Sequence, residues 1–254
     1  MPDTVTTARL FCMVSSAGPW PADAHTGDNK HATSVVAIDP DTGVIKGSHQ
    51  YHWNDNWDWD EVAAPLLIDV KRNGRAFKGL VHPGRNGYLW LLERKADGIE
   101  FVDGKPYVKH DVITGLEPKT GRLIYNMDKM LKIGKQVTFC PSHWGGKDWP
   151  PAAFNPKTKL LYIPAQQNIC TTLAGEAKIA PYAAGKRYVG TDASKTRVFP
   201  REGADHIGEV QAWDMDTGKL AWTYNFPDML PNWGPLLTTG GGLVFGGGSA
   251  DRKF

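Results

Sequence analysis

Residues 35–46 read VVAIDPDTGVIK, and residues 210–222 repeat the pattern as VQAWDMDTGKLAW. In both stretches an alternating apolar segment leads into a turn of Asp, Thr and Gly, and a second apolar segment follows. Gly43 and Gly218 supply the positive φ that such a turn needs. Each stretch therefore predicts a β-hairpin.

Weaker copies of the hairpin pattern occur at residues 91–98, 116–123 and 154–162. Gly43 and Gly218 are 175 residues apart, which at a blade length of roughly 40 to 50 residues corresponds to about four blades. Repeated hairpins at this spacing favour an all-β propeller, or a piece of one, built from four-stranded blades. The alternative is a β-sandwich, which does not need near-identical hairpins this far apart.

The segments between the hairpins divide into short strands and long connections. Residues 64–70, 79–82 and 242–246 are apolar and bounded by turn residues, so each predicts a short strand. Residues 19–31 and 179–206 lack the hairpin pattern and are expected to be long surface connections.

Composition excludes several classes of protein. The 254 residues carry 29 Lys and Arg against 27 Asp and Glu, a net charge of +2 that gives no footprint for nucleic acid. No apolar run approaches the length of a membrane helix, and 28 Gly, 18 Pro and 10 Trp are typical of short strands and tight turns.

The N-terminus and the cysteines bear on the compartment. The apolar stretch at residues 10–14 is too short for a secretory core, so no export signal is predicted. Cys140 and Cys170 are 30 residues apart and Cys12 is the third cysteine. The spacing matches no zinc motif, and the residues alone favour two buried thiols over a disulfide.

The densest polar cluster is YHWNDNWDWDE at residues 51–61. If residues 57–60 are extended, Asp58 and Asp60 lie on one face and the two tryptophans on the other. Two carboxylates at that spacing can bind one hard cation. An Asx-rich turn over packed tryptophans is the alternative, but repulsion among four acids favours a site.

At these residues the chain resembles the quinoprotein alcohol dehydrogenases, the pyrroloquinoline quinone (PQQ) enzymes of the methanol and ethanol dehydrogenase type. The resemblance covers nearly the whole chain in the family's order. It rests on NDNWDWD at residues 54–60, HPGRNG at 82–87, GGKDWPP at 145–151, GEVQAWD at 208–214 and NWG at 232–234. It implies an eight-bladed propeller of which this chain forms about four blades.

The resemblance also implies roles for the acids. Asp58 matches the family's general base, which accepts the alcohol proton while hydride passes to the quinone. Asp58 would also be a metal ligand, and Asp60 matches the additional acid that accompanies a lanthanide rather than Ca2+. The metal would act as a Lewis acid on the quinone.

Further matches concern cofactor contacts and the compartment. Arg85 aligns with the cation that contacts the quinone oxygens, and Asp148 and Trp149 align with a polar residue and a ring against the cofactor. Trp233 matches another stretch near the cofactor. Cys140 and Cys170 match a disulfide of the family, which together with the resemblance implies a periplasmic protein.

The chain also departs from the family pattern. It has about half of the family's length and lacks several of its motifs, and residues 1–16 diverge, with Ser16 where the family has a metal-ligating Asn. We therefore expect a divergent segment at residues 1–16 and a partial quinoprotein propeller at 17–254. A truncated form lacking part of the site would need the missing half, or another copy, to cover its cut edges.

Two functions follow as hypotheses. The first is PQQ-dependent oxidation of a primary alcohol with Ca2+ or a lanthanide, and with a cytochrome c as electron acceptor. The second is a non-catalytic propeller that binds partners. Acids and cations converging at Asp58, Asp60, Arg85 and Asp148 favour the enzyme, because a scaffold has no need of them.

Overall fold

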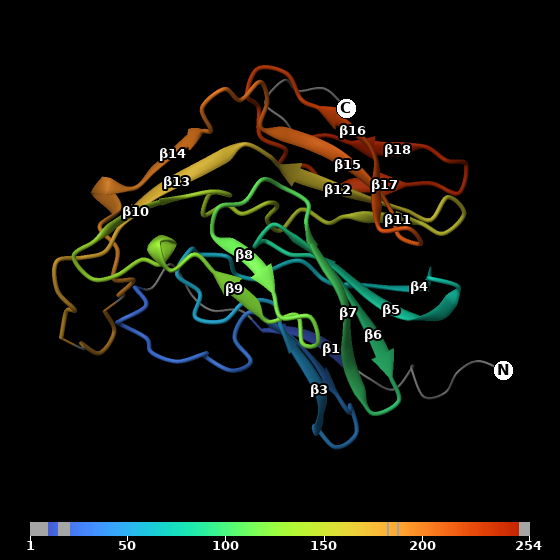
Figure 1. Ribbon diagram of the computed structural model, residues 1–254, viewed down its shortest axis with the longest axis horizontal. Helices are drawn as coiled ribbons and strands as arrows, with labels where there is room; N and C mark the ends of the chain where they lie inside the picture. The colour runs from blue at the N-terminus through green and yellow to red at the C-terminus, as the bar shows by residue number, and fades with distance from the viewer. Residues whose placement is uncertain (1–9, 15–20, 182, 187, 249–254) are drawn as a thin grey trace.

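The computed structural model describes residues 21–181, 183–186 and 188–248, and the backbone of residues 10–14. Ser16 and most of the divergent N-terminal segment lie outside these ranges. The described strands form six antiparallel sheets, and Figure 1 follows them from the blue β1–β3 sheet to the red β17–β18 hairpin. The prediction of an all-β chain is confirmed.

The sheets differ in size, and two of them are four-stranded. One is β4 (Leu66–Arg72), β5 (Arg75–Pro83), β6 (Tyr88–Lys95) and β7 (Gly98–Pro106). The other is β11 (Ala153–Asn155), β12 (Leu160–Gln166), β15 (Gly208–Asp214) and β16 (Lys219–Asn225).

The remaining sheets have two or three strands. Three-stranded sheets are β1 (Leu10–Val14) with β2 (Ser34–Ile38) and β3 (Ile45–Gln50), and β10 (Gln136–Phe139) with β13 (Ile169–Ala174) and β14 (Arg197–Pro200). Two-stranded ones are β8 (Ile113–Leu116) with β9 (Leu123–Tyr125), and β17 (Leu236–Thr238) with β18 (Val244–Gly246). Two 3-10 turns, η1 (Met127–Lys129) and η2 (Ala193–Lys195), complete the described elements.

The five predicted hairpins are all present, as β2–β3, β6–β7, β8–β9, β11–β12 and β15–β16. Local turn chemistry explains the two strongest. Asp39 accepts the amides of Asp41 and Thr42 at 3.1 Å, and Gly43 has φ 71°. Asp214 makes the equivalent contacts in the second hairpin at 2.9 Å. The side chain thus closes the turn before the strands pair.

The long surface connection expected over residues 179–206 carries two short elements that the sequence did not predict. It contains η2 and also β14, which pairs with β13 in an antiparallel register. Val198 pairs with Thr171, and Phe199 pairs with Cys170. Partner strands far away in sequence determine this strand, so the local pattern does not reveal it.

The central strands β5 and β6 of the β4–β7 sheet are largely buried on both faces. Leu80, Trp90 and Leu92 belong to one apolar cluster, which also contains Trp57 and Trp59. Val81, Leu89 and Leu91 point to the other face and pack with residues of β12 and β15. This alternation is the period of two along a strand, and each buried large side chain contributes roughly 1.5 to 3 kcal/mol. The two apolar clusters therefore hold β5 and β6 in place from both faces of the sheet.

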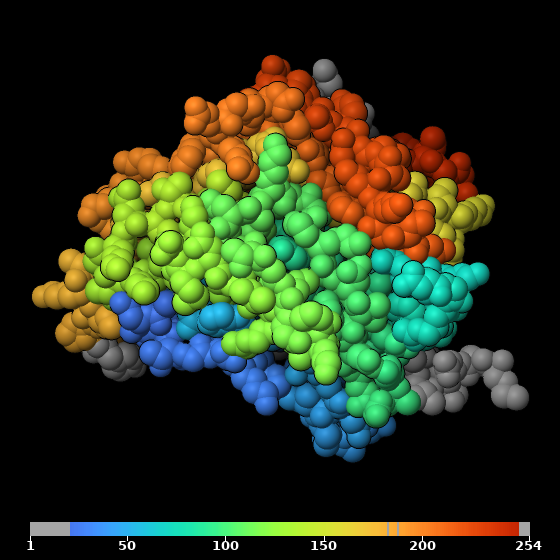
Figure 2. Space-filling model, viewed as in Figure 1, coloured from blue at the N-terminus to red at the C-terminus, as the bar shows by residue number. Residues whose placement is uncertain are grey.

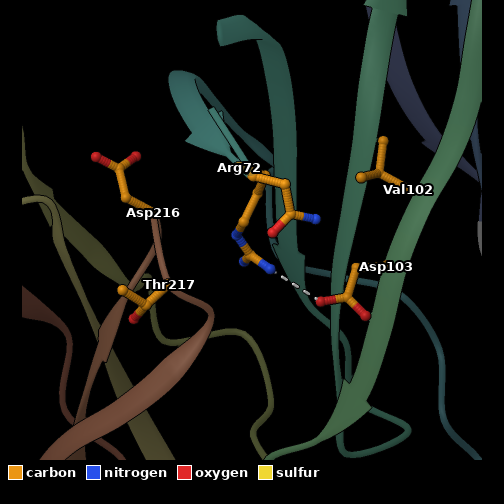
Figure 3. A pocket seen from close by; sticks show the side chains of 6 residues that line it. Arg72, Val102, Asp103, Asp216 and Thr217 are labelled. Atoms are coloured by element: carbon orange, nitrogen blue, oxygen red, sulfur yellow. Dashed lines mark hydrogen bonds and ion pairs between the residues drawn. The ribbon is translucent and has the colours of Figure 1, made fainter. Parts of the chain in front are cut away.

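A polar contact joins the two four-stranded sheets at their edges (Figure 3). Arg72 Nε donates to the Met215 carbonyl at 2.9 Å, and Arg72 Nη1 donates to Asp103 at 3.1 Å. A cavity of about 630 Å³ lies between these side chains and Asp216 and Thr217 of the β15–β16 turn. The turn is therefore docked against the β4–β7 sheet.

The structure pairs Cys140 and Cys170 as a disulfide. Cys140 directly follows β10, and Cys170 lies in the neighbouring strand β13. The pairing implied by the family resemblance is thus present, and the preference for two free thiols is wrong. The side chain of Cys12 lies outside the described residues.

Among the described residues, the structure contains no helix with the length and apolar character needed to cross a membrane.

Candidate active site

The Asp58 loop connects β3 to β4. Residues 57–60 are not the extended segment expected, because Asp58 has a left-handed φ of 67°. The expected partition of side chains holds nevertheless. Trp57 and Trp59 are fully buried with ring centroids 5.0 Å apart, whereas Asp58 keeps partial exposure.

Distant carbonyls hold the two tryptophans. Trp57 Nε1 donates to the Lys129 carbonyl at 2.8 Å, and Trp59 Nε1 donates to the Ser142 carbonyl at 2.9 Å. A buried indole N–H needs such a partner. Between these two buried rings the backbone turns at Asp58, whose side chain keeps partial exposure.

Arg85 lies in the turn between β5 and β6 and faces the Asp58 carboxylate. Its Nη2 is 3.8 Å from Asp58 Oδ2 and 3.5 Å from Asp148 Oδ2, and it donates to the His143 carbonyl at 3.0 Å. Its buried Nε has no hydrogen-bond acceptor among the described residues. Three segments distant in sequence therefore meet at one guanidinium that retains a free donor.

The electrostatics of Asp58 are unusual. Burial, together with the nearby carboxylates Asp60, Asp55 and Asp148, raises the pKa of the Asp58 carboxyl to about 7 against the opposing effect of Arg85. A carboxyl with a pKa near neutrality can exchange a proton at physiological pH. Burial also lowers the pKa of His143 to about 4.

The loop after the disulfide carries Asp148 and a buried lysine. Lys147 is 1% exposed, and its amine donates to the Asp148 carbonyl at 2.7 Å. Burial lowers the pKa of Lys147 to about 8, although Glu61 and Asp148 act against that shift. Gly146 donates to the Arg85 carbonyl at 2.9 Å, so this loop is attached to the Arg85 turn through the backbone.

The other predicted site residues lie less centrally. Asp60 is half-buried and close enough to raise the pKa of Asp58. Trp149 is 58% exposed, and only its backbone amide contacts Asp148. Trp233 packs its ring against Trp144 at 5.4 Å, next to His143. Asp58, Arg85 and Asp148 thus form a cluster, with Trp149 and Trp233 at its margin.

Asp58 and Asp60 are hard oxygen donors of the kind that Ca2+ and lanthanides prefer. The part of the chain that the structure describes brings no three His, Cys, Asp or Glu side chains together in a metal-binding group. A cation on Asp58 and Asp60 would therefore need further ligands from the cofactor or from other residues. The free donor on Arg85 fits an anionic or carbonyl-bearing cofactor.

Sequence reasoning missed two residues at the base of this cluster. The Glu61 carboxylate is buried and lies 2.6 Å from His82 Nε2. Both residues stand inside quoted motifs, but nothing in their spacing predicts that they meet, because they belong to different segments. A charged residue inside a stretch of buried neighbours was the available signal.

Comparisons with known proteins find similar chains among the PQQ-dependent dehydrogenases. Residues 11–107 match the family model of the PQQ glucose/ethanol/alcohol dehydrogenase β-propeller domain. The chain is 31% identical to a quinoprotein ethanol dehydrogenase of Pseudomonas putida over 95% of its own length and 40% of the relative's. It is 33% identical to a lanthanide-dependent methanol dehydrogenase of Methylacidiphilum fumariolicum, covering 92% of this chain and 37% of that one.

Solved structures give the same result. A europium-containing methanol dehydrogenase superposes with a TM-score of 0.84 at 30% identity, over 94% of this chain and 40% of that one. A quinohemoprotein alcohol dehydrogenase from Comamonas testosteroni superposes with a TM-score of 0.77 at 28% identity, over 94% and 36% of the two chains.

The chain spans about two fifths of the length of these relatives. The matched domain, the antiparallel sheets and the relatives that cover nearly all of this chain point to one conclusion. Over nearly its whole length the chain is similar, in sequence and in fold, to part of the β-propeller of the quinoprotein (PQQ-dependent) alcohol dehydrogenases.

Proposed function

We propose that the chain contributes one side of a PQQ-dependent alcohol dehydrogenase site that oxidises a primary alcohol. The observation that carries this proposal is the Asp58–Arg85–Asp148 cluster, in which one guanidinium lies 3.8 Å and 3.5 Å from two carboxylates. Relatives named as alcohol, ethanol and methanol dehydrogenases support the reaction class.

When bound, PQQ supplies the carbonyl that accepts hydride from the alcohol carbon. The chain's own residues prepare that transfer. Asp58 accepts the proton of the alcohol hydroxyl, and its pKa of about 7 lets it exist ionised at neutral pH. Arg85 donates to the cofactor's oxygens through the free Nε, and a fixed cation there favours the reduced, more anionic form.

Asp58 and Asp60 together hold the cation, Ca2+ or a lanthanide. A cation between them would offset the repulsion that raises the pKa of Asp58 and would keep this base ionised. The second carboxylate gives more charge compensation for a trivalent ion. Similarity to a lanthanide-dependent relative supports that choice.

Asp148, Trp149 and Trp233 would complete the cofactor's surroundings. Asp148 lies 3.5 Å from the same Nη2 of Arg85 that faces Asp58. The exposed Trp149 ring and the partly exposed Trp233 ring offer apolar faces to a planar cofactor. These contacts position the cofactor and exclude water without taking part in proton transfer.

The wider context follows from the family. We propose a periplasmic protein, consistent with the Cys140–Cys170 disulfide, and a cytochrome c as electron acceptor. The exposed apolar side chains of β16 would be covered by the remainder of a propeller or by a second copy. A purely partner-binding propeller is less favoured, because it gives no reason for an ionisable cluster at Arg85.

The proposal is tested by titrating the purified chain with PQQ and following tryptophan fluorescence, with and without Ca2+ or La3+. We expect saturable binding of one PQQ per chain, weakened about tenfold or more in Arg85→Gln. La3+ should tighten binding, and Asp60→Ala should remove most of that effect.

Asp41→Asn is the control, because Asp41 lies exposed in the β2–β3 turn far from Arg85 in sequence. Equal PQQ binding by the wild type and Arg85→Gln, or no saturable binding at all, would contradict the proposal.

A further inference from the structure

Glu61 is a buried carboxylate that the proposed proton and cofactor chemistry does not use. It follows the Asp58–Asp60 pair directly and is 2% exposed. A carboxylate this deeply buried costs free energy unless charged or hydrogen-bonding groups surround it. The groups that contact the Glu61 carboxylate therefore indicate its role.

One oxygen of Glu61 contacts both ends of the segment that leads to Arg85. Glu61 Oε2 lies 2.6 Å from His82 Nε2, at the end of β5, and accepts the backbone amide of Arg85 at 3.2 Å. The other oxygen lies 3.8 Å from His52 Nδ1. A Cβ on Gly84 would come within 3.1 Å of this oxygen, so the turn packs closely on the carboxylate.

Burial alone would raise the pKa of Glu61. The charge and hydrogen bond of His82, followed by His52 and the Arg85 amide, outweigh burial and hold the pKa below its usual value. The contacts of the two carboxylate oxygens with His82, His52 and the Arg85 amide thus hold the turn against Glu61.

The opposite side of the Arg85 backbone is held by a second contact. Gly146 donates to the Arg85 carbonyl at 2.9 Å, and the same loop carries Asp148. With its amide bound to Glu61 and its carbonyl bound to Gly146, the Arg85 backbone has little freedom. Its guanidinium can then remain between Asp58 and Asp148 without a bound cofactor.

We propose that Glu61 is a positioning residue that fixes the Arg85 turn to the Asp58–Asp60 loop, so that the guanidinium is preorganised for the cofactor. Glu61 does not touch the cofactor. The inference rests on the proposed function for the identity of that cofactor, but the fixed orientation of Arg85 can be measured without it.

Glu61→Gln keeps the shape of the side chain and removes its charge. The matched control is Glu209→Gln, because Glu209 is 5% exposed and also lies 2.6 Å from a histidine, His206, in another sheet. Both variants should lower the melting temperature to a similar extent. A comparison between them therefore removes the general effect of losing a buried acid.

The first readout is the Arg85 Nε–H signal in 1H–15N NMR of the cofactor-free chain, assigned by its loss in Arg85→Lys. We expect a sharp, slowly exchanging signal in the wild type and in Glu209→Gln. In Glu61→Gln the signal should broaden and exchange faster with water. Glu61→Asp should restore part of the sharp signal, because it retains the charge.

The second readout is the dissociation constant for free PQQ, which should rise about tenfold in Glu61→Gln and remain unchanged in Glu209→Gln. An Arg85 signal and a PQQ affinity in Glu61→Gln equal to those of the control would overturn the positioning role.

If the wild type fails to bind PQQ, the proposed function fails, and the Arg85 signal alone decides the role of Glu61. If Glu61→Gln does not fold, His82→Gln replaces it. This variant removes the 2.6 Å partner of the same oxygen and should give the same broadening.

Discussion

At the scale of the single residue, Asp58 combines a functional requirement with a cost in stability. Burial raises its pKa from 3.8 to about 7, so the native state retains a proton that the unfolded chain releases. The free energy of unfolding contributed by this group therefore falls as the pH rises from about 4 to about 7. A bound cation would reverse much of this loss.

Asp58→Asn removes that pH dependence. Between about pH 4 and pH 8 the wild type should lose about 1 to 3 kcal/mol more stability than the variant, measured by urea denaturation of the metal-free proteins. Asp41→Asn is the control for the same chemical change at an exposed site. If the free energy of unfolding had the same pH dependence in the wild type and in Asp58→Asn, ionisation of Asp58 would not destabilise the native state.

The sequence singled out candidate site residues without predicting their geometry. Asp58, Arg85 and Asp148 were assigned from motifs, and the structure brings the Arg85 guanidinium within 4 Å of both carboxylates. Spacing could not predict this, because the three residues come from different loops. The left-handed backbone at Asp58 was also not predicted, and the neighbouring Trp57 and Trp59 bind carbonyls of Lys129 and Ser142 that are distant in sequence.

At the scale of the element, the loop that carries Asp148 depends on a glycine. Gly145 has φ 82°, and a Cβ there would lie 2.2 Å from the Arg85 carbonyl oxygen. Gly145→Ala should lower the free energy of unfolding by about 2 kcal/mol or more, because the added Cβ would clash with the Arg85 backbone. The variant should also weaken PQQ binding.

The control for this loop is Gly203→Ala, which has a similar φ of 72° and no atom within 4 Å of the added Cβ. Gly203→Ala should lower the free energy of unfolding by about 1 kcal/mol, because only the strain of a left-handed alanine applies there. Thermal or urea unfolding of both variants measures the difference. A similar loss in both would mean that the loop does not press against Arg85.

The disulfide constrains a second element. Cys140 and Cys170 close a loop with a sequence separation of 30 and join the strand pair β10–β13. Replacing both by Ser should lower the free energy of unfolding by about 3 to 4 kcal/mol. Urea unfolding of the oxidised wild type and the double variant tests this, and an unchanged midpoint would contradict it.

Hairpins were the elements that the sequence predicted well. In β2–β3 and β15–β16 an aspartate closes the turn on its own neighbours, so the information is local. Strand β14 was missed for the opposite reason. Its residues are mostly exposed, and its pairing with β13 is the interaction that defines it.

At the scale of the whole molecule, strand β16 exposes apolar side chains that a closed fold would cover. All seven of its residues are exposed, and Figure 2 shows this segment in orange to red at the surface. Trp222 is 42% and Tyr224 58% exposed, beside the apolar cluster that contains Tyr162 and Ala212. A surface of this kind promotes association.

Trp222→Glu combined with Tyr224→Glu should raise the fraction of monomer in sedimentation velocity and reduce the binding of an apolar dye. Because Trp222 also packs on the buried Tyr162, the melting temperature should fall modestly from the loss of this contact. A wild-type chain that is monomeric at all concentrations and binds no dye would show that this face needs no cover.

The central claim is that Asp58, Asp60 and Arg85 form one side of a metal and PQQ site. The most direct measurement is anomalous diffraction from crystals of this chain grown with PQQ and La3+. The account predicts an anomalous peak bound by the carboxylates of Asp58 and Asp60, with the quinone against the Arg85 guanidinium. A lanthanide bound elsewhere, or PQQ without contact to Arg85, would contradict it.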